Sequence, residues 1–151
     1  MTVWVDSDSC AREARALAAR AASQRRLRVH LVGDRSVPEG KMPEVEETVV
    51  ETGGDAADDY IVAHAEGADL VITRDLLLAE RLTEGGVTVL NDSGEVYTRE
   101  NIAERRSVRD FMYGLRQSGA YPERGRSRGR RETQAFANAF DRELTRRLNR
   151  S

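Results

Sequence analysis

Short apolar runs alternate with segments of helical periodicity along the first 90 residues, and this alternation constrains the fold more than any other feature. The runs at residues 2–5, 27–32, 68–73 and 87–90 are each long enough for a buried strand. A fifth run, at residues 46–50, follows a Pro/Gly-rich loop and is expected to form an edge strand. Strands that are joined through helices pair in parallel. The sequence therefore predicts a three-layer α/β/α fold with a central, mostly parallel sheet.

Helices are predicted between these strands and after the last one. The first is expected to begin after the cap-forming residues Ser7, Asp8 and Ser9 and to end near residue 25. The others are expected at residues 56–66, 75–83, 99–117 and 132–148.

Apolar positions on the last two helices indicate how they pack. The helix at 99–117 is expected to dock on the body through Ile102, Val108, Phe111, Met112 and Leu115. The last helix carries Phe136, Phe140 and Leu144 at a spacing of four. We therefore predict an α/β domain at residues 1–117, a basic flexible linker at 118–131, and a C-terminal helix at 132–151 that docks on the same domain.

The net charge of −2 conceals an uneven distribution. Residues 1–100 hold 11 basic and 20 acidic side chains, whereas residues 101–151 hold 13 basic and 6 acidic ones. All basic residues except Lys41 are arginines, whose planar guanidinium suits bidentate phosphate contact. A split of this kind is typical of proteins that contact nucleic acid or a membrane surface.

Several classes of protein are excluded by composition. No apolar run approaches the roughly 20 residues of a membrane span, and Asp6 and Asp8 interrupt any N-terminal signal segment. The single cysteine, Cys10, excludes an internal disulfide framework and a multi-cysteine zinc site. We expect a cytoplasmic protein without membrane contact, and an oligomer is compatible with the sequence.

Aspartates follow the predicted strands at the edge where ligands bind in open parallel sheets. Asp6 and Asp8 follow the first strand, and Asp75 follows the strand at 68–73. Asp55 and Asp58 lie at the junction between the loop after the strand at 46–50 and the helix at 56–66. Asn91 and Asp92 follow the last strand. Each aspartate alone is a plausible helix cap, but converging carboxylates must raise their pKa values, separate or bind a cation. Oxygen ligands without His or Cys suit Mg²⁺ or Mn²⁺, which serve nucleases and phosphatases.

Other chemistries have weaker support. The chain has no G-x-G-x-x-G and no P-loop motif, so nucleotide cofactors lack a phosphate cradle. His30 and His64 are isolated and are expected to be structural. Cys10 lies near a helix start but has no evident base partner, so we expect a small packed residue rather than a nucleophile.

Several blocks of the chain resemble one bacterial and archaeal family. They are V-D-S-D-S-C, G-D-A-A-D-D-Y-I-V, D-L-V-I-T-R-D-L-L-L-A, G-E-V-Y-T-R-E-N-I and R-D-F-M-Y-G-L-R. In this order they resemble the YaiI/YqxD family, which is related by pattern to PIN-like domains, mostly Mg²⁺- or Mn²⁺-dependent ribonucleases. The chain departs from the family at Ala11, where proline is usual, and this affects helix entry rather than chemistry.

The resemblance implies a PIN-like fold and a specific acidic set. Asp6, Asp58 and Asp75 match the catalytic positions that bind the metal, and Asp8 and Asp55 match positions expected to be accessory ligands or caps. The function implied is a divalent-metal-dependent nuclease acting on RNA.

Arginines near these aspartates and in the linker are the expected phosphate contacts. They are Arg74, Arg124, Arg126, Arg128, Arg130 and Arg131. A flexible Gly/Ser/Arg run suits sequence-independent binding of a polyanion. Alternatively, the Arg-rich run is a solvated loop without a ligand. For Arg74, the alternative is a solvated surface residue.

Two further functions stay open at this point. In the first, the protein binds nucleic acid without catalysis and the aspartates only cap helices. In the second, the D-x-D motif at Asp6 supplies the nucleophile of a small-molecule phosphatase, as in haloacid-dehalogenase-type enzymes, although Lys41 lies in a loop without a supporting pattern.

Overall fold

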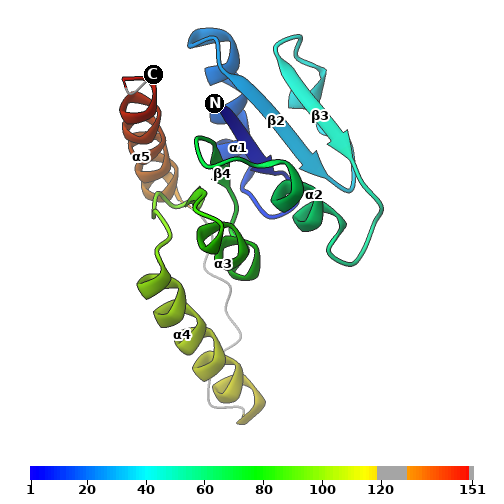
Figure 1. Ribbon diagram of the computed structural model, residues 1–151. Helices are drawn as coiled ribbons and strands as arrows, with labels where there is room; N and C mark the ends of the chain where they lie inside the picture. Colours follow the sequence, from blue (N-terminus) through cyan, green and yellow to red (C-terminus); the bar gives the residue numbers. More distant parts are fainter. Residues whose placement is uncertain (119–128, 150–151) are drawn as a thin grey trace.

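The computed structural model describes residues 1–118 and 129–149. One five-stranded sheet runs through it, and every pair of neighbouring strands is parallel. The strands are β1 (Thr2–Asp6), β2 (Arg28–Gly33), β3 (Val45–Val49), β4 (Leu70–Ile72) and β5 (Thr88–Leu90), in the spatial order β3-β2-β1-β4-β5 (Figure 1). The predicted parallel sheet is confirmed, with β3 at one edge.

Helices cover both faces of this sheet. They are α1 (Arg12–Gln24), α2 (Ala56–His64), α3 (Leu76–Glu84), α4 (Arg99–Ser118) and α5 (Arg130–Leu148), and a short 3₁₀ helix, η1, spans Pro38–Lys41. Side chains alternate along β1: Val3 and Val5 pack with α1 and α5, whereas Trp4 packs with α2 and α3. The three-layer α/β/α architecture predicted from the alternation of strands and helices is therefore confirmed.

The strand order reverses between β1 and β4, at the centre of the sheet. The chain leaves β1 towards β2 and β3 on one side, and later returns to build β4 and β5 on the other. Connections on the two sides leave a crevice at the carboxyl ends of β1 and β4, which is where ligands bind in open α/β sheets. Asp6 ends β1 and Asp75 follows β4, so both lie at this crevice.

The start of α1 differs from the prediction. Ala11 is the N-cap residue and makes no side-chain capping bond, so Ser7, Asp8 and Ser9 do not cap the helix. The backbone N–H of Ala11 instead donates to Asp92 Oδ2 at 2.7 Å, and Asp92 follows β5. A carboxylate 81 residues away in the chain therefore holds the start of the helix.

The packing of α4 also differs from the prediction. Ile102, near its start, is buried, but Val108 and Phe111 are 51% and 63% exposed. The helix runs beside α3 and then extends away from the sheet, as Figure 1 shows, so its later turns do not reach the core. The predicted docking is therefore confirmed for Ile102 and wrong for Val108 and Phe111, while Met112 and Leu115 are half-buried. None of the helices in residues 1–118 and 129–149 is both long and apolar enough to cross a membrane.

The C-terminal helix α5 lies against the face that α1 also covers. Phe136, Phe140 and Leu144 are buried in this core, and the two phenylalanine rings stack with their centroids 5.4 Å apart. Ala139 lies between them and is also buried, so the buried stripe is continuous along the helix.

Removing one of these rings should destabilise the whole domain. Phe136→Ala leaves a cavity at a fully buried position, and we expect it to lower the free energy of unfolding by about 3–5 kcal/mol. Phe111→Ala is the matched control, because that ring is 63% exposed, and its effect should stay within about 0.5 kcal/mol. Urea denaturation followed by circular dichroism measures both, and equal effects would show that α5 does not contribute to the core.

Candidate active site at the carboxyl edge of the sheet

Asp6 is the last residue of β1, at the point where the strand order reverses, and is 4% exposed. Its Oδ2 accepts hydrogen bonds from Ser9 Oγ at 2.9 Å and from Thr73 Oγ1 at 2.7 Å. Within the described residues Oδ1 accepts none. Burial raises the pKa of Asp6, the two hydroxyl donors lower it, and the charges of Asp8 and Asp75 raise it further.

The two hydroxyl groups that contact Asp6 also connect β1 to the loop after β4. Thr73 Oγ1 accepts a hydrogen bond from the N–H of Asp75 at 3.0 Å, and Ser9 Oγ accepts one from the N–H of Arg74 at 3.1 Å. The hydroxyls of Ser9 and Thr73 lie 3.2 Å apart. This network fixes the loop that carries Asp75 relative to Asp6.

Asp75 caps α3 as its N-cap residue. Its Oδ1 accepts from the N–H groups of Leu77 and Leu78, at 2.9 and 3.3 Å. Within the part of the chain that the structure describes, its second carboxylate oxygen has no hydrogen bond. Capping and ligand binding can therefore coexist at Asp75, because they use different oxygens.

Asp58, in the first turn of α2, has the most perturbed carboxyl of the predicted set. Its pKa is raised to about 7, first by burial and then by the negative charges of Asp75, Asp6 and Asp55, while Arg81 lowers it. Carboxylates from β1, α2 and the loop before α3 thus interact electrostatically at one edge of the sheet. A proton or a cation there relieves the repulsion.

Asp8 and Asp55 lie at the margin of this group. Asp8 is directed towards the end of β2, where its Oδ2 accepts from the N–H of Asp34 at 2.9 Å, and burial followed by the charge of Asp34 raises its pKa. Asp55 is exposed and occupies the N-cap position of α2 without a side-chain capping bond. Neither residue contacts Asp6 through a hydrogen bond.

The carboxylates approach one another without closing into a complete ligand set. Among the described residues, no three His, Cys, Asp or Glu side chains lie close enough together to hold one ion by themselves. Any cation in this crevice must complete its coordination with water or substrate oxygens.

Arg74 is engaged by a carboxylate that the predicted set omitted. Its Nη2 donates to Asp92 Oδ2 at 2.7 Å and its Nε to Oδ1 at 3.3 Å. Asp92 is 1% exposed, whereas the Arg74 side chain is 56% exposed. The hydrogen bond to Asp92 raises the pKa of Arg74. The guanidinium therefore balances Asp92 and still presents one side to solvent next to Asp75.

The other predicted phosphate contacts lie apart from this loop. Arg130 and Arg131 are exposed in the first turn of α5, and Arg130 borders a hollow together with Glu13 of α1. Arg124, Arg126 and Arg128 lie outside the described residues.

Two other aspartates near these strands have structural partners. Asp69, at the amino end of β4, accepts from the N–H of Thr2, from Trp4 Nε1 and from the N–H of Glu66, at 2.8 to 3.0 Å. Asp59 is paired with Arg81 Nη1 at 2.9 Å. Neither belongs to the crevice.

The cysteine and the histidines are structural, as expected. The buried Cys10 thiol donates to the carbonyl of Ile72 at 3.3 Å, and burial raises its pKa, which disfavours the thiolate. His30 stacks on Trp4 and lies 2.7 Å from Thr48 Oγ1. His64 stacks on Tyr60 and its Nδ1 lies 2.8 Å from that residue's carbonyl oxygen.

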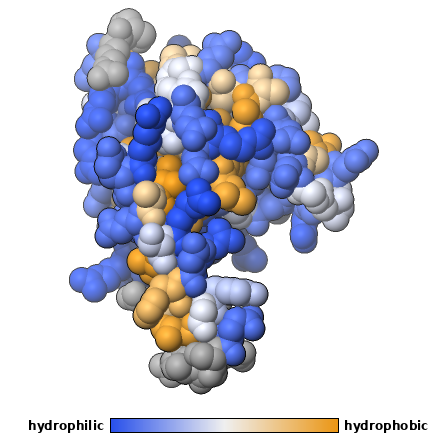
Figure 2. All heavy atoms as spheres, turned by 60° about the horizontal axis from the view of Figure 1, so that its bottom comes forward, coloured by the Kyte–Doolittle hydropathy of each residue, from blue (hydrophilic) through white to orange (hydrophobic). Residues whose placement is uncertain are grey.

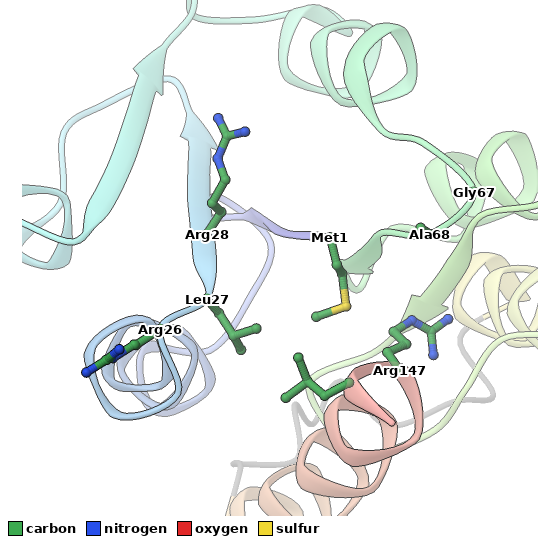
Figure 3. A pocket seen from close by; sticks show the side chains of 8 residues that line it. Met1, Arg26, Leu27, Arg28, Gly67, Ala68 and Arg147 are labelled. Atoms are coloured by element: carbon green, nitrogen blue, oxygen red, sulfur yellow. The ribbon is translucent and has the colours of Figure 1, made fainter. Parts of the chain in front are cut away.

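A hollow at the opposite edge of the sheet lacks this chemistry. It has a volume of about 640 Å³ and lies at the amino ends of the strands, where Met1 and Leu27 point into it while Arg26 and Arg28 point away (Figure 3). Among residues 1–118 and 129–149, no carboxylate lines it. The carboxyl edge is therefore the better candidate for the active site.

Three residues of the carboxyl edge were missing from the predicted set. They are Ser9, Thr73 and Asp92. Asp92 had a visible signal, because it follows the last predicted strand as the other aspartates follow theirs. The hydroxyls had none, since their role depends on the pairing of β1 with β4.

Known proteins resemble the chain over nearly its whole length. Residues 4–146 match the sequence model of a family described as an uncharacterized BCR, the YaiI/YqxD family. A "UPF0178 protein" of Treponema pallidum is 43% identical over 148 residues, which cover 98% of this chain and 84% of the relative. Proteins of the same printed name from Stutzerimonas stutzeri and Pseudomonas fluorescens SBW25 are 42% and 40% identical over 151 residues, with 99–100% of each chain covered.

The raised pKa of Asp58 makes stability depend on pH in a defined direction. Folding favours the protonated carboxyl, so this group destabilises the folded state increasingly as the pH rises from about 4 to about 7, and no further above that. Asp58→Asn removes the effect. Relative to wild type, its free energy of unfolding should rise by about 1–2 kcal/mol across this range, allowing for solvent screening of a partly exposed group.

Urea denaturation between pH 4 and 8 measures this difference, and Asp59→Asn is the matched control. Asp59 is the next residue of α2, but it is paired with Arg81. Parallel stability curves for wild type and Asp58→Asn would contradict the electrostatic coupling of Asp58 to Asp6 and Asp75.

Proposed function

We propose that this chain, which belongs to the YaiI/YqxD family, is a divalent-metal-dependent nuclease that acts on RNA. The observation that carries the proposal is the electrostatic interaction of Asp6, Asp58 and Asp75 at the strand-order reversal of a parallel sheet. These three carboxylates have raised pKa values or oxygens unused by hydrogen bonds in the described residues, and their negative charge is only partly balanced by Arg81 and Arg74.

The donor set fits Mg²⁺ or Mn²⁺. It consists of oxygen atoms only, with Asp6 Oδ1 and the second oxygen of Asp75 unused by hydrogen bonds in the described residues. Mg²⁺ usually keeps several water ligands and takes one or two carboxylates from the protein. The open spacing of these aspartates is compatible with that mode, and Asp8 and Asp55 would act on the ion through water.

The cation would supply charge neutralisation at a phosphodiester and an activated water as nucleophile. The chain's own residues then have separate roles. Ser9 and Thr73 orient Asp6, the cap geometry orients Asp75, and Asp58 has a pKa near neutrality, which is suited to holding or releasing a proton. Arg74 offers a cationic side chain next to Asp75.

Nucleic-acid binding without catalysis is the second candidate. The observation that favours it is that no three carboxylates are close enough to hold one ion directly. In that case Asp75 acts as a helix cap, Arg74 and Asp92 form a structural pair, and no metal dependence exists.

Metal binding and cleavage separate the two candidates. We expect calorimetric titration of Mn²⁺ to reveal a site in wild type that is lost in Asp6→Asn/Asp75→Asn. Cleavage of a labelled RNA with Mn²⁺ should fall at least about 100-fold in the same variant, since even indirect disturbance of a metal site costs 10–100-fold. Both replacements keep the size of the side chain and its capacity to accept hydrogen bonds.

Asp59→Asn is the control, because Asp59 lies on the same helix as Asp58 but outside the crevice. It should bind Mn²⁺ and cleave RNA as wild type does. Absence of binding heat in wild type would refute the metal-dependent mechanism, and cleavage that persists in the double variant would show that these aspartates are not the catalytic groups.

A further inference from the structure

We propose that the groove between α3 and α4 is a nucleotide-binding site in which Arg109 contacts a backbone phosphate and Tyr113 stacks on an unpaired base. The proposal deepens the proposed function and rests on it for the reaction, because the groove opens onto the same carboxylate site.

Arg109 connects three neighbouring hollows along α4. One, of about 460 Å³, is also lined by Ser9, Arg74 and Asp75, so it belongs to the candidate active site. A second, of about 690 Å³, shares Leu77 with the first and extends to Tyr113. The third, of about 340 Å³, shares Arg74 with the first. The hollows therefore form a path from Asp75 along α4.

Arg109 is the cation of this path that has no acidic partner in the part of the chain that the structure describes. Three neighbouring arginines are already paired, at 2.7 Å each: Arg105 with Glu95, Arg106 with Glu80 and Arg74 with Asp92. Asp110 also lines the outer hollow but makes no ion pair with Arg109. An unpaired, exposed guanidinium is available for bidentate contact with a phosphate.

Tyr113 lies on the same face of α4 as Arg109, four residues further on. Tyr113 is 64% exposed, and Leu77 on α3 is about half exposed. Figure 2 shows apolar side chains gathered at the projecting end of the molecule, where α4 comes forward. The two residues are separated by about 6 Å of helix rise, so one nucleotide can contact both.

The charges at the groove favour a nucleotide over a protein partner. Asp6, Asp58 and Asp75 repel anions, so a polyanionic substrate needs a cation beside the crevice, and Arg109 supplies one. An exposed aromatic ring next to an arginine is typical of single-strand binding, because every unpaired base offers a face for stacking. The ring cannot stack in this way on a base that is paired within a duplex.

Binding can be measured without cleavage by using a fluorescein-labelled ten-nucleotide oligouridylate in EDTA. Fluorescence anisotropy should show that Tyr113→Ala raises Kd at least about fivefold, whereas Tyr113→Phe, which keeps the ring, stays within about twofold. Arg109→Ala should raise Kd. It should also make the negative slope of the logarithm of the association constant against log salt shallower by about 0.7, which corresponds to the loss of one single-strand phosphate contact. Arg20→Ala, an exposed position of α1 on the other side of the sheet, is the control and should change neither quantity.

The outcomes separate this proposal from the proposed nuclease function. The proposed nucleotide-binding groove is refuted if wild type does not bind the oligonucleotide, or if Arg109→Ala and Tyr113→Ala bind it as Arg20→Ala does. If wild type nevertheless cleaves RNA with Mn²⁺, the proposed nuclease function is unaffected. Loss of binding in both variants, without cleavage by wild type, would support the groove and refute the nuclease. A dimer that Tyr113→Ala dissociates in sedimentation velocity, without a change in RNA affinity, would overturn the groove in favour of a self-association surface.

Discussion

The parallel pairing of β1 with β4 is the interaction on which the rest of the structure depends. It places the end of β1 beside the loop that follows β4, and the strand order reverses between them. Because the connections from the two strands run to opposite sides, side chains at this point are not covered by a crossing loop. Asp6 and Asp75 meet there, and the hydroxyl groups of Ser9 and Thr73 hold the two segments in register.

Negative charge at this edge is only partly balanced. Two hydroxyl donors stabilise the Asp6 carboxylate, and Arg74 with the N–H of Ala11 satisfies Asp92, which is buried. Within the described residues Asp58 has no comparable donors, and burial, followed by the charges of the neighbouring carboxylates, raises its pKa. An uneven distribution of this kind is typical of functional sites, where groups that titrate near neutrality lie beside groups whose charge is structurally fixed.

Much of the fold follows from local patterns. The apolar runs and the helical periodicity predict the strands and the helices α1–α3, since each element must bury one face or stripe. The helix α4 was also predicted, but the docking expected of its apolar face was wrong at Val108 and Phe111, which remain exposed. Periodicity identifies an apolar face, but it does not say whether another element of the same chain covers that face. The cap of α1 was wrong for a related reason, because its partner, Asp92, lies 81 residues away.

The sequence by itself determined that aspartates follow several strands of a parallel sheet, because alternating strands and helices leave every strand with the same direction. Only the tertiary structure decided which of them interact. It brought Asp6, Asp58 and Asp75 into electrostatic contact, directed Asp8 to the end of β2 and paired Arg74 with Asp92. The reason is physical: strand order and side-chain pairing depend on contacts between distant segments, which no local pattern of residues encodes.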